Sequence, residues 1–151
     1  MSGASAGAES PILSESLKGR LVSLVVILVC AAPLVTGWLL EPSPKGYGTH
    51  ESLRLPPCGW LLVTGKPCMT CGMTTAVTLA VHGRIPEAFF AQPAGLVVAI
   101  VLASGLWLGV HSLLAGASPG PFLEELTRSR WVWAGAGLIL AAAWAYKVVT
   151  F

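Results

Sequence analysis

Residues 21–40 read LVSLVVILVCAAPLVTGWLL, a run of twenty residues without a charged side chain. About 20 apolar residues in a helix cross a hydrocarbon core about 30 Å thick. A helix also satisfies its own backbone hydrogen bonds where no water is present. The run therefore predicts a membrane-spanning helix. A cleaved signal peptide is disfavoured, because the apolar segment of such a peptide has only about 7–15 residues.

Two later runs have the same character. Residues 94–114 contain His111 as their only ionisable side chain, and residues 131–149 contain only Lys147, near their end. We expect Lys147 to extend outward to the membrane surface, as long cationic side chains do at span ends. The whole chain is 54% hydrophobic and only 11% charged, whereas soluble domains have about 25% charged residues. Three spans are predicted.

The rest of the chain supplies a leader and a connecting region. Residues 1–20 are rich in Ser, Ala and Gly at their start and predict a disordered leader, followed by one polytopic membrane domain over residues 21–151. Apolar residues recur at helical spacing over residues 73–82, but ten residues rise only about 15 Å. We predict an all-α membrane protein with three transmembrane helices plus a short interfacial or re-entrant helical hairpin. A fourth span broken within residues 60–81 is the alternative.

Basic residues give an orientation. Lys18 and Arg20 precede the first span, and Arg128 and Arg130 precede the third. The positive-inside rule then predicts a cytoplasmic N-terminus, with residues 41–93 and the C-terminus outside, in a cell inner membrane. The net charge of +2 gives no electrostatic basis for binding nucleic acid.

Small residues recur at four-residue spacing within the second and third spans. Such residues let helix backbones approach closely. We expect them to pack the protein's own helices, with contacts to a second copy or another membrane protein as the alternative. The residues concerned are Gly95, Ala99, Ala103, Gly105, Gly109, Gly137, Ala141 and Ala145.

Three cysteines lie in the connecting region, residues 57–93. Cys68 and Cys71 form a Cys-x-x-Cys pair, and Cys58 lies ten residues before it. These three are candidate redox residues, or ligands of a zinc ion with His50 as a remote fourth. His82 is too far along the helix to share a metal with Cys71, and we expect it to cap the last turn. One such pair is a weak signal for either chemistry.

The stretch PPCGWLLVTGKPCMTCGMTTAVTLAVHGRIPEAFFAQPAGLV resembles the core of a bacterial membrane-protein family called domain of unknown function 2752. The resemblance implies a polytopic bacterial membrane protein and assigns no reaction. Met69, Thr75 and Gln92 stand where the family usually has proline, arginine and asparagine. Besides the cysteines, the matching positions that we take as supporting the motif are Thr64, Gly65, Gly72, Thr74, His82 and Gly83.

Three functions compete. A transporter or channel is disfavoured, because no acidic or basic residue lies in the middle of a predicted span. The sequence favours a non-enzymatic accessory or structural role, in which the cysteine turn stabilises the hairpin. The alternative is a membrane thiol–disulfide or metal-handling protein that uses Cys58, Cys68 and Cys71.

Overall fold

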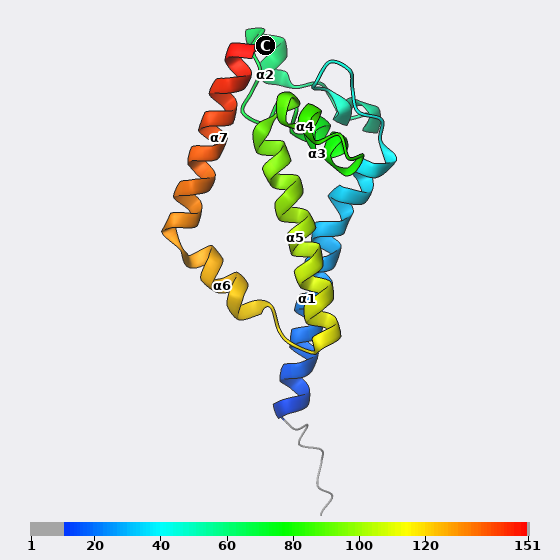
Figure 1. Ribbon diagram of the computed structural model, residues 1–151, viewed down its shortest axis with the longest axis vertical. Coiled ribbons are helices and arrows are strands. Elements are labelled where there is room, and N and C mark those ends of the chain that lie inside the picture. Colours follow the sequence, from blue (N-terminus) through cyan, green and yellow to red (C-terminus); the bar gives the residue numbers. More distant parts are fainter. Residues whose placement is uncertain (1–10, 151) are drawn as a thin grey trace, which may run out of the picture.

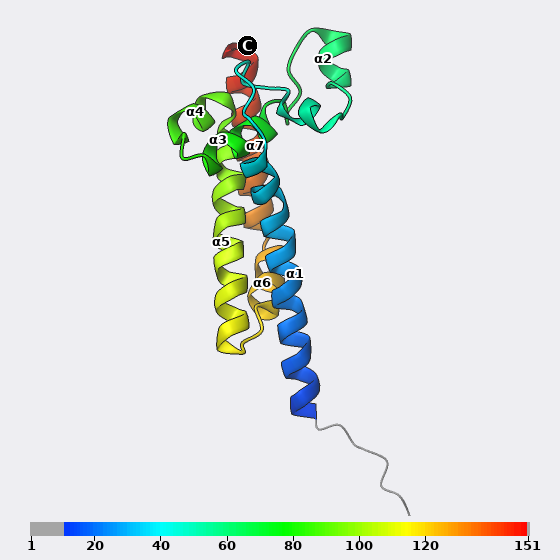
Figure 2. The ribbon, with the colours of Figure 1, turned by 90° about the vertical axis from the view of Figure 1, so that its right-hand side faces the viewer.

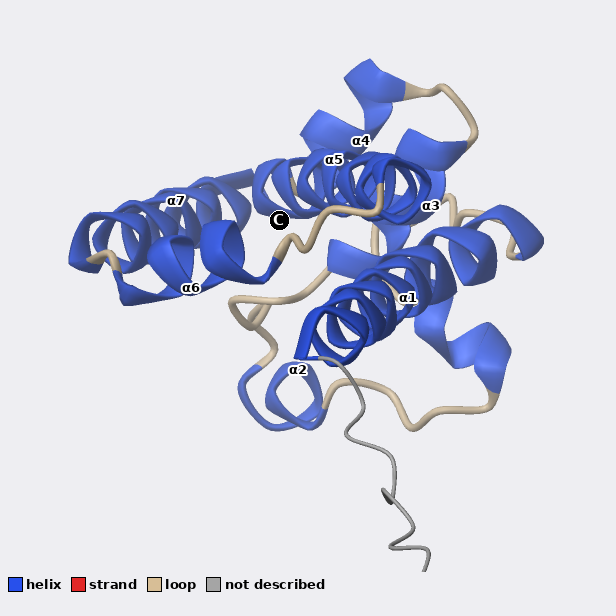
Figure 3. Cartoon of the chain, turned by 90° about the horizontal axis from the view of Figure 1, so that it is seen from below, coloured by secondary structure: helices blue, strands red, loops and turns tan. Residues whose placement is uncertain are grey.

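The computed structural model describes residues 11–150, and the regular structure of this part is entirely helical (Figure 3). The all-α prediction is confirmed. The elements, in chain order, are α1 (Pro11–Leu39), the 3-10 helix η1 (Thr49–Leu53), α2 (Gly59–Thr64), α3 (Met73–Val81), α4 (Ile85–Ala91), α5 (Pro93–Ala115), α6 (Gly120–Arg128) and α7 (Arg130–Thr150).

Three of the described helices, α1, α5 and α7, are long and apolar enough to cross a membrane. The second and third begin and end within one residue of the predicted spans. Within the described part of the chain, no fourth helix is long enough to cross a membrane. Residues 60–81 divide into α2, of 6 residues, and α3, of 9 residues, and neither is longer than about 14 Å.

The first helix starts earlier than predicted. α1 begins at Pro11, so the disorder predicted for residues 11–20 is wrong, and residues 1–10 of the predicted leader lie outside the described part. Leu17 precedes Leu21 and Leu24 at helical spacing. A turn that continues an existing helix gains one hydrogen bond per residue without the cost of starting a new helix.

Helices α1 and α5 lie side by side and antiparallel (Figures 1 and 2). Glycines of α5 bring them together: a Cβ at Gly109 would lie 2.8 Å from Cγ1 of Ile27, and one at Gly105 would lie 2.8 Å from Sγ of Cys30. The prediction that small residues pack the protein's own helices is confirmed for α5. Cys30 therefore serves packing within the spans.

Helix α7 makes far less contact with the other spans. It approaches them near its C-terminal end and diverges from them toward its N-terminal end (Figure 1). A Cβ at Gly135 or Gly137 would meet no atom within 4 Å. The small residues of α7 therefore do not repeat the packing role of those in α5.

Helix α6, which connects α5 to α7, was not predicted from the sequence. Its sequence, GPFLEELTR, places Phe122 and Leu126 four residues apart, with Glu124 and Glu125 on the other side. The Ser118 hydroxyl accepts a hydrogen bond from the Gly120 amide at 3.2 Å, just before the helix starts. An amphipathic helix of this kind suits the surface of a membrane.

Residues 41–92, called the head below, lie at one end of the bundle with the C-terminus (Figures 1 and 2). The start of α1 and the segment after α5 lie at the other end, where a Cβ at Gly19 would lie 3.2 Å from Cβ of Ser118. An odd number of spans requires this separation of the two ends of the chain.

A hairpin of α3 and α4 forms the core of the head. Buried Ala76 and Leu79 of α3 pack with Ala88 and Ala91 of α4. Gly83, at φ 77°, lets the chain reverse between the two helices. The small side chains also allow a close approach to α5, where a Cβ on Gly95 would lie 2.7 Å from Cβ of Ala76.

Both faces of α3 are covered by protein. Thr75 and Thr78 on one face are fully buried. Val77 on the opposite face is also buried, at 8% exposure, because Gly37 of α1 lies against it. Val77 therefore does not face lipid, and α3 has no free apolar side.

Candidate thiol site

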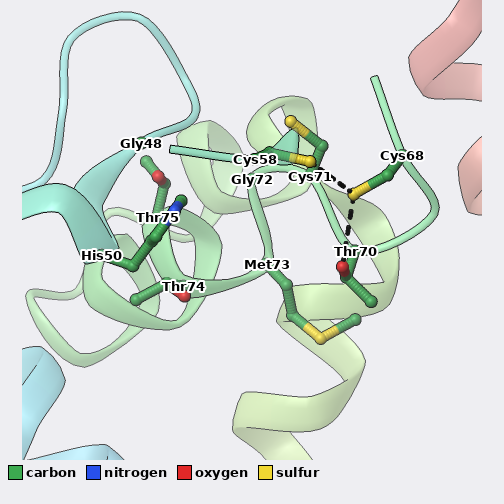
Figure 4. Close-up of a pocket in the computed structure, with 10 residues that line it drawn as sticks. All are labelled: Gly48, His50, Cys58, Cys68, Thr70, Cys71, Gly72, Met73, Thr74 and Thr75. Carbon is green, nitrogen blue, oxygen red and sulfur yellow. Dashed lines mark hydrogen bonds between the residues drawn. The ribbon is translucent and has the colours of Figure 1, made fainter. Parts of the chain in front are cut away.

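Three of the four cysteines gather at one cavity of about 360 Å³ in the head. Figure 4 shows the sulfur atoms of Cys58, Cys68 and Cys71 on one side of this cavity, with His50 and Thr74 on the other. All four cysteines are free thiols. The structure thus brings together the three predicted candidate residues, although Cys58 is separated from the pair by α2.

The turn after α2 returns the chain so that Cys68 meets Cys58. Gly65 ends α2 at φ 67°, a conformation that glycine adopts without strain. Thr64 Oγ1 donates to the Trp60 carbonyl at 2.7 Å and accepts from the Lys66 amide at 3.2 Å. The result is a distance of 3.4 Å between Sγ of Cys58 and Sγ of Cys68. Thr64 and Gly65 therefore shape the site without contributing a reactive group.

A second turn joins the cysteine pair to α3. The Cys71 amide donates to the Cys68 carbonyl at 3.1 Å, and Gly72 follows at φ 89°. A Cβ on Gly72 would lie 2.7 Å from the Gly46 carbonyl oxygen and 3.1 Å from that of Ala91. Only glycine fits here, since both the backbone conformation and the space exclude a side chain.

Two side chains from distant parts of the chain hold this loop. Gln92, between α4 and α5, is fully buried and donates from Nε2 to the Met69 carbonyl at 2.9 Å. Trp144 of α7 donates from Nε1 to the Pro67 carbonyl at 3.2 Å. The backbone around the cysteine pair is therefore fixed on both sides.

A pair of threonines ties the first part of the head to α3. Thr49 Oγ1 lies 2.8 Å from Thr75 Oγ1, and both side chains are buried. Thr49 Oγ1 also accepts from the Ser43 amide at 3.0 Å. A neutral, buried hydrogen bond thus joins η1 to α3.

The cysteine thiols differ in acidity. Partial burial raises the pKa of Cys68, but hydrogen bonds from Thr70 and Cys58 outweigh it and leave that pKa below its ordinary value. Burial raises the pKa of Cys71, and negative charge on Cys68 or Cys58 raises it further. Because the thiolate is the reactive form of cysteine, the Cys68 thiol is expected to react more readily than the Cys71 thiol.

The predicted metal chemistry has weaker geometric support. Within residues 11–150, no group of three or more His, Cys, Asp or Glu side chains is arranged to hold a metal ion. His82 lies outside the cavity, as expected. Its Nδ1 lies 2.8 Å from the Thr78 carbonyl oxygen, and its ring stacks on that of Trp38 at 5.3 Å. His82 and Gly83 therefore end α3 and take no part in the thiol site.

Sequence reasoning missed three residues around the site: Gln92, Trp144 and Lys147. The sequence did not predict that Gln92 and Trp144 would bind the backbone of the cysteine loop. Lys147 was expected to point outward, but it is buried at 6% exposure and donates to the Ala91 carbonyl at 2.9 Å. That expectation is wrong, because the head covers the end of α7.

Comparisons with known proteins agree with the predicted resemblance. Residues 58–106 match the family model described as "Protein of unknown function (DUF2752)". The match begins at Cys58, includes the cysteine pair and α3, and ends within α5. Neither the comparison with curated proteins nor that with solved structures found a match.

Proposed function

We propose that this multi-pass membrane protein uses Cys58 and Cys68 as a reversible thiol–disulfide pair at one face of the membrane. The observation that supports this proposal is the 3.4 Å separation of their sulfur atoms at a cavity. Cys58 donates its S–H to Cys68, and this arrangement suits a nucleophile with its resolving thiol. Disulfide formation requires the sulfur atoms to move to about 2.05 Å.

The exchange proceeds in two balanced steps with a disulfide of a partner polypeptide. The Cys68 thiolate attacks one partner sulfur, and the other partner sulfur leaves as a thiolate and takes up a proton. Cys58 then loses its proton and attacks the Cys68 sulfur, which releases the remaining partner sulfur. Two electrons pass to the partner, whose disulfide becomes a dithiol, while Cys58 and Cys68 become a disulfide. The reverse sequence oxidises a partner dithiol.

An apolar cavity beside Cys68 suits a polypeptide substrate. It has a volume of about 440 Å³ and is lined by Trp60, Met69, Thr70 and Trp144 together with Cys68. Trp60 is 57% exposed. Pockets that hold ligands are mostly apolar with a few polar groups that fix orientation. An apolar side chain next to a partner cysteine would fit here while its sulfur meets Cys68.

A redox titration of the purified protein tests this proposal. In glutathione buffers of graded potential, followed by alkylation and peptide mapping, Cys58 and Cys68 should change state together in one two-electron transition. Cys58→Ala should abolish that transition, and Cys30→Ala, a change within the spans, should leave it unchanged. Bound zinc is assayed on the same samples. Independent alkylation of Cys58 and Cys68 at every potential would contradict the proposal, and stoichiometric zinc would favour the metal-handling alternative.

A non-enzymatic accessory role is the second candidate, and a different observation favours it. α7 carries small residues at which a Cβ would meet no atom within 4 Å, as at Gly137. A span with so little contact to its own chain suits a subunit that packs against another membrane protein or a second copy. Chemical cross-linking in native membranes from a cysteine introduced at Gly137 tests this role. Cross-links to lipid alone would argue against it.

We infer that the protein lies in a bacterial inner membrane with the head outside the cytoplasm. The basic residues that precede the first and third spans, Lys18, Arg20, Arg128 and Arg130, support this orientation. An oxidising compartment outside the membrane would also favour disulfide exchange.

A further inference from the structure

A second cavity of the head, distinct from the thiol site, is lined by cations. It has a volume of about 640 Å³ and lies between the loop at residues 42–46, α4 and the last turns of α7. Lys45, Arg84 and Lys147 line it, together with a single carboxylate, that of Glu87. The charged side chains of the lining therefore sum to two positive charges, from three cations and one anion. The proposed thiol exchange uses none of these residues.

Lys147 is the most buried of the three cations, at 6% exposure. Its ammonium donates to the carbonyl oxygens of Ala91 at 2.9 Å and Gly46 at 3.4 Å. An ammonium has three N–H donors, so one is left for another acceptor. In the described part of the chain, no carboxylate lies within ion-pair distance of Lys147. Among the described residues, the ammonium is thus met by peptide dipoles alone, and a buried charge without a counter-ion is destabilising.

The Cys71 thiol also interacts electrostatically with Lys147. Burial raises the pKa of the Cys71 thiol, so this group is neutral near pH 7 and supplies no negative charge. Arg84 is paired with Glu87, to which its Nε donates at 2.7 Å. Glu87 therefore balances Arg84, and Lys45 and Lys147 remain for an anion.

The cavity lies at the C-terminal end of the third span, where we expect lipid headgroups. Lys147 and Thr150 belong to the last turn of the third span, and Phe90 and Tyr146 line the same cavity. Phe90 is 67% exposed. Aromatic rings gather at this level of a membrane, and basic pockets between spans bind anionic headgroups. The lining of this cavity therefore combines positive charge, hydrogen-bond donors and apolar surface.

We propose that this cavity binds a phosphate group, presented by an anionic phospholipid or as a free ion, with Lys147 and Lys45 as its cationic contacts. Lys147 is the fixed contact because its ammonium is held by two carbonyl oxygens. Lys45, which is exposed, closes over the group from the loop. An ammonium attracts phosphate as a point charge, without the planar match that arginine offers.

Lipid retention on the full-length protein provides the test. The protein is extracted from vesicles that contain equal amounts of phosphatidylglycerol and phosphatidylcholine, and retained lipid is counted by native mass spectrometry. In a second arm, inorganic phosphate is titrated calorimetrically into the protein in a nonionic detergent. Selective retention of phosphatidylglycerol with no phosphate binding identifies a lipid headgroup. Binding in both arms identifies the phosphate group itself as the ligand, and binding in neither overturns the proposal.

Two single-charge variants make the result specific to the cavity. Lys45→Gln should weaken binding about fivefold, the effect of one cation near a membrane surface. Lys66→Gln removes an equally exposed lysine of the head that does not line this cavity, and it should leave binding unchanged. Equal losses in both variants would mean that the surface attracts anions generally, which would also overturn a defined site. Neither change alters the cysteines, so the redox titration should remain as in the wild type.

Discussion

Cys68 and Cys71 lie three positions apart, yet their thiols have different surroundings. Cys68 is half-buried and receives hydrogen bonds from Thr70 and Cys58, which leave its pKa below the ordinary value despite burial. Cys71 is buried, and its pKa is raised. A Cys-x-x-Cys spacing alone cannot distinguish these two environments. The geometry instead pairs Cys68 with Cys58, which the sequence offered only as one of several partners.

The pH dependence of alkylation should separate the two thiols. The rate at each cysteine follows its thiolate fraction. The rate at Cys68 should therefore reach half its maximum at a lower pH than the rate at Cys71, because the pKa of Cys68 is lowered and that of Cys71 is raised. Cys58→Ala removes one hydrogen bond from Cys68 and should move its midpoint to higher pH. The measurement is peptide-resolved labelling with iodoacetamide between about pH 6 and about pH 10, a range that includes the ordinary thiol pKa. Identical midpoints at Cys68 and Cys71 would show that the two thiols do not differ in pKa.

Gly72 should be the least replaceable glycine of the head. Gly72→Ala imposes a positive φ on a residue with a side chain, at a cost of about 1–2 kcal/mol, and forces Cβ against the Gly46 and Ala91 carbonyl oxygens. Gly65→Ala is the matched control, because Gly65 also has a positive φ but has no atom within 4 Å of its Cβ position. Thermal unfolding in detergent should show a larger loss of stability for Gly72→Ala. Equal losses of stability in the two variants would mean that the positive φ alone sets the cost and that the close carbonyl oxygens add nothing.

Side chains at the site were harder to predict than backbone turns. Gly65, Gly72 and Gly83 were singled out by the motif, and each has the positive φ that glycine permits. Lys147 was misplaced, since an outward direction assumes that water lies beyond the end of a span. Here residues 46 and 91 lie there instead and offer carbonyl oxygens to its ammonium. A long-range contact of this kind leaves no trace in local sequence.

Among the helices, α5 and α7 have similar sequences of small and apolar residues but different packing. A Cβ at Gly109 of α5 would lie 2.8 Å from Ile27, whereas one at Gly137 of α7 would meet nothing within 4 Å. Spacing of small residues therefore predicts that a helix can pack closely, but not which partner it meets. The lengths of the spans were predictable because the bilayer fixes them. The amphipathic α6, of nine residues, was not predicted from the sequence.

A matched pair of substitutions tests this difference between the helices. Gly109→Leu inserts a side chain between α5 and α1 and should lower stability by about 1–3 kcal/mol, the usual cost of overpacking. Gly137→Leu should change the stability of the isolated protein by much less, since the new side chain faces open space. Both are measured by thermal unfolding in the same detergent. A larger loss from Gly137→Leu would mean that α7 packs against a neighbour in the purified protein.

For the whole molecule, three spans place the two ends of the bundle on opposite sides of the membrane. Glu51 belongs to η1 in the head, and Glu124 belongs to α6 at the other end. Reporter fusions after these residues should report opposite compartments, with the head outside and α6 in the cytoplasm. A fusion at Thr150 should agree with the fusion at Glu51, because the C-terminus lies with the head. Reports from the same side at Glu51 and Glu124 would contradict the three-span arrangement.

The two contacts from α7 to the head have a consequence for biosynthesis. Trp144 holds the carbonyl of Pro67, and Lys147 holds those of Gly46 and Ala91. A chain leaves the ribosome from its N-terminus, at about 5–20 residues per second. The cysteine loop is therefore made well before the helix that fastens it. Until α7 is translated and inserted, the loop lacks the contact from Trp144, so a prematurely terminated chain would display its thiols without this support.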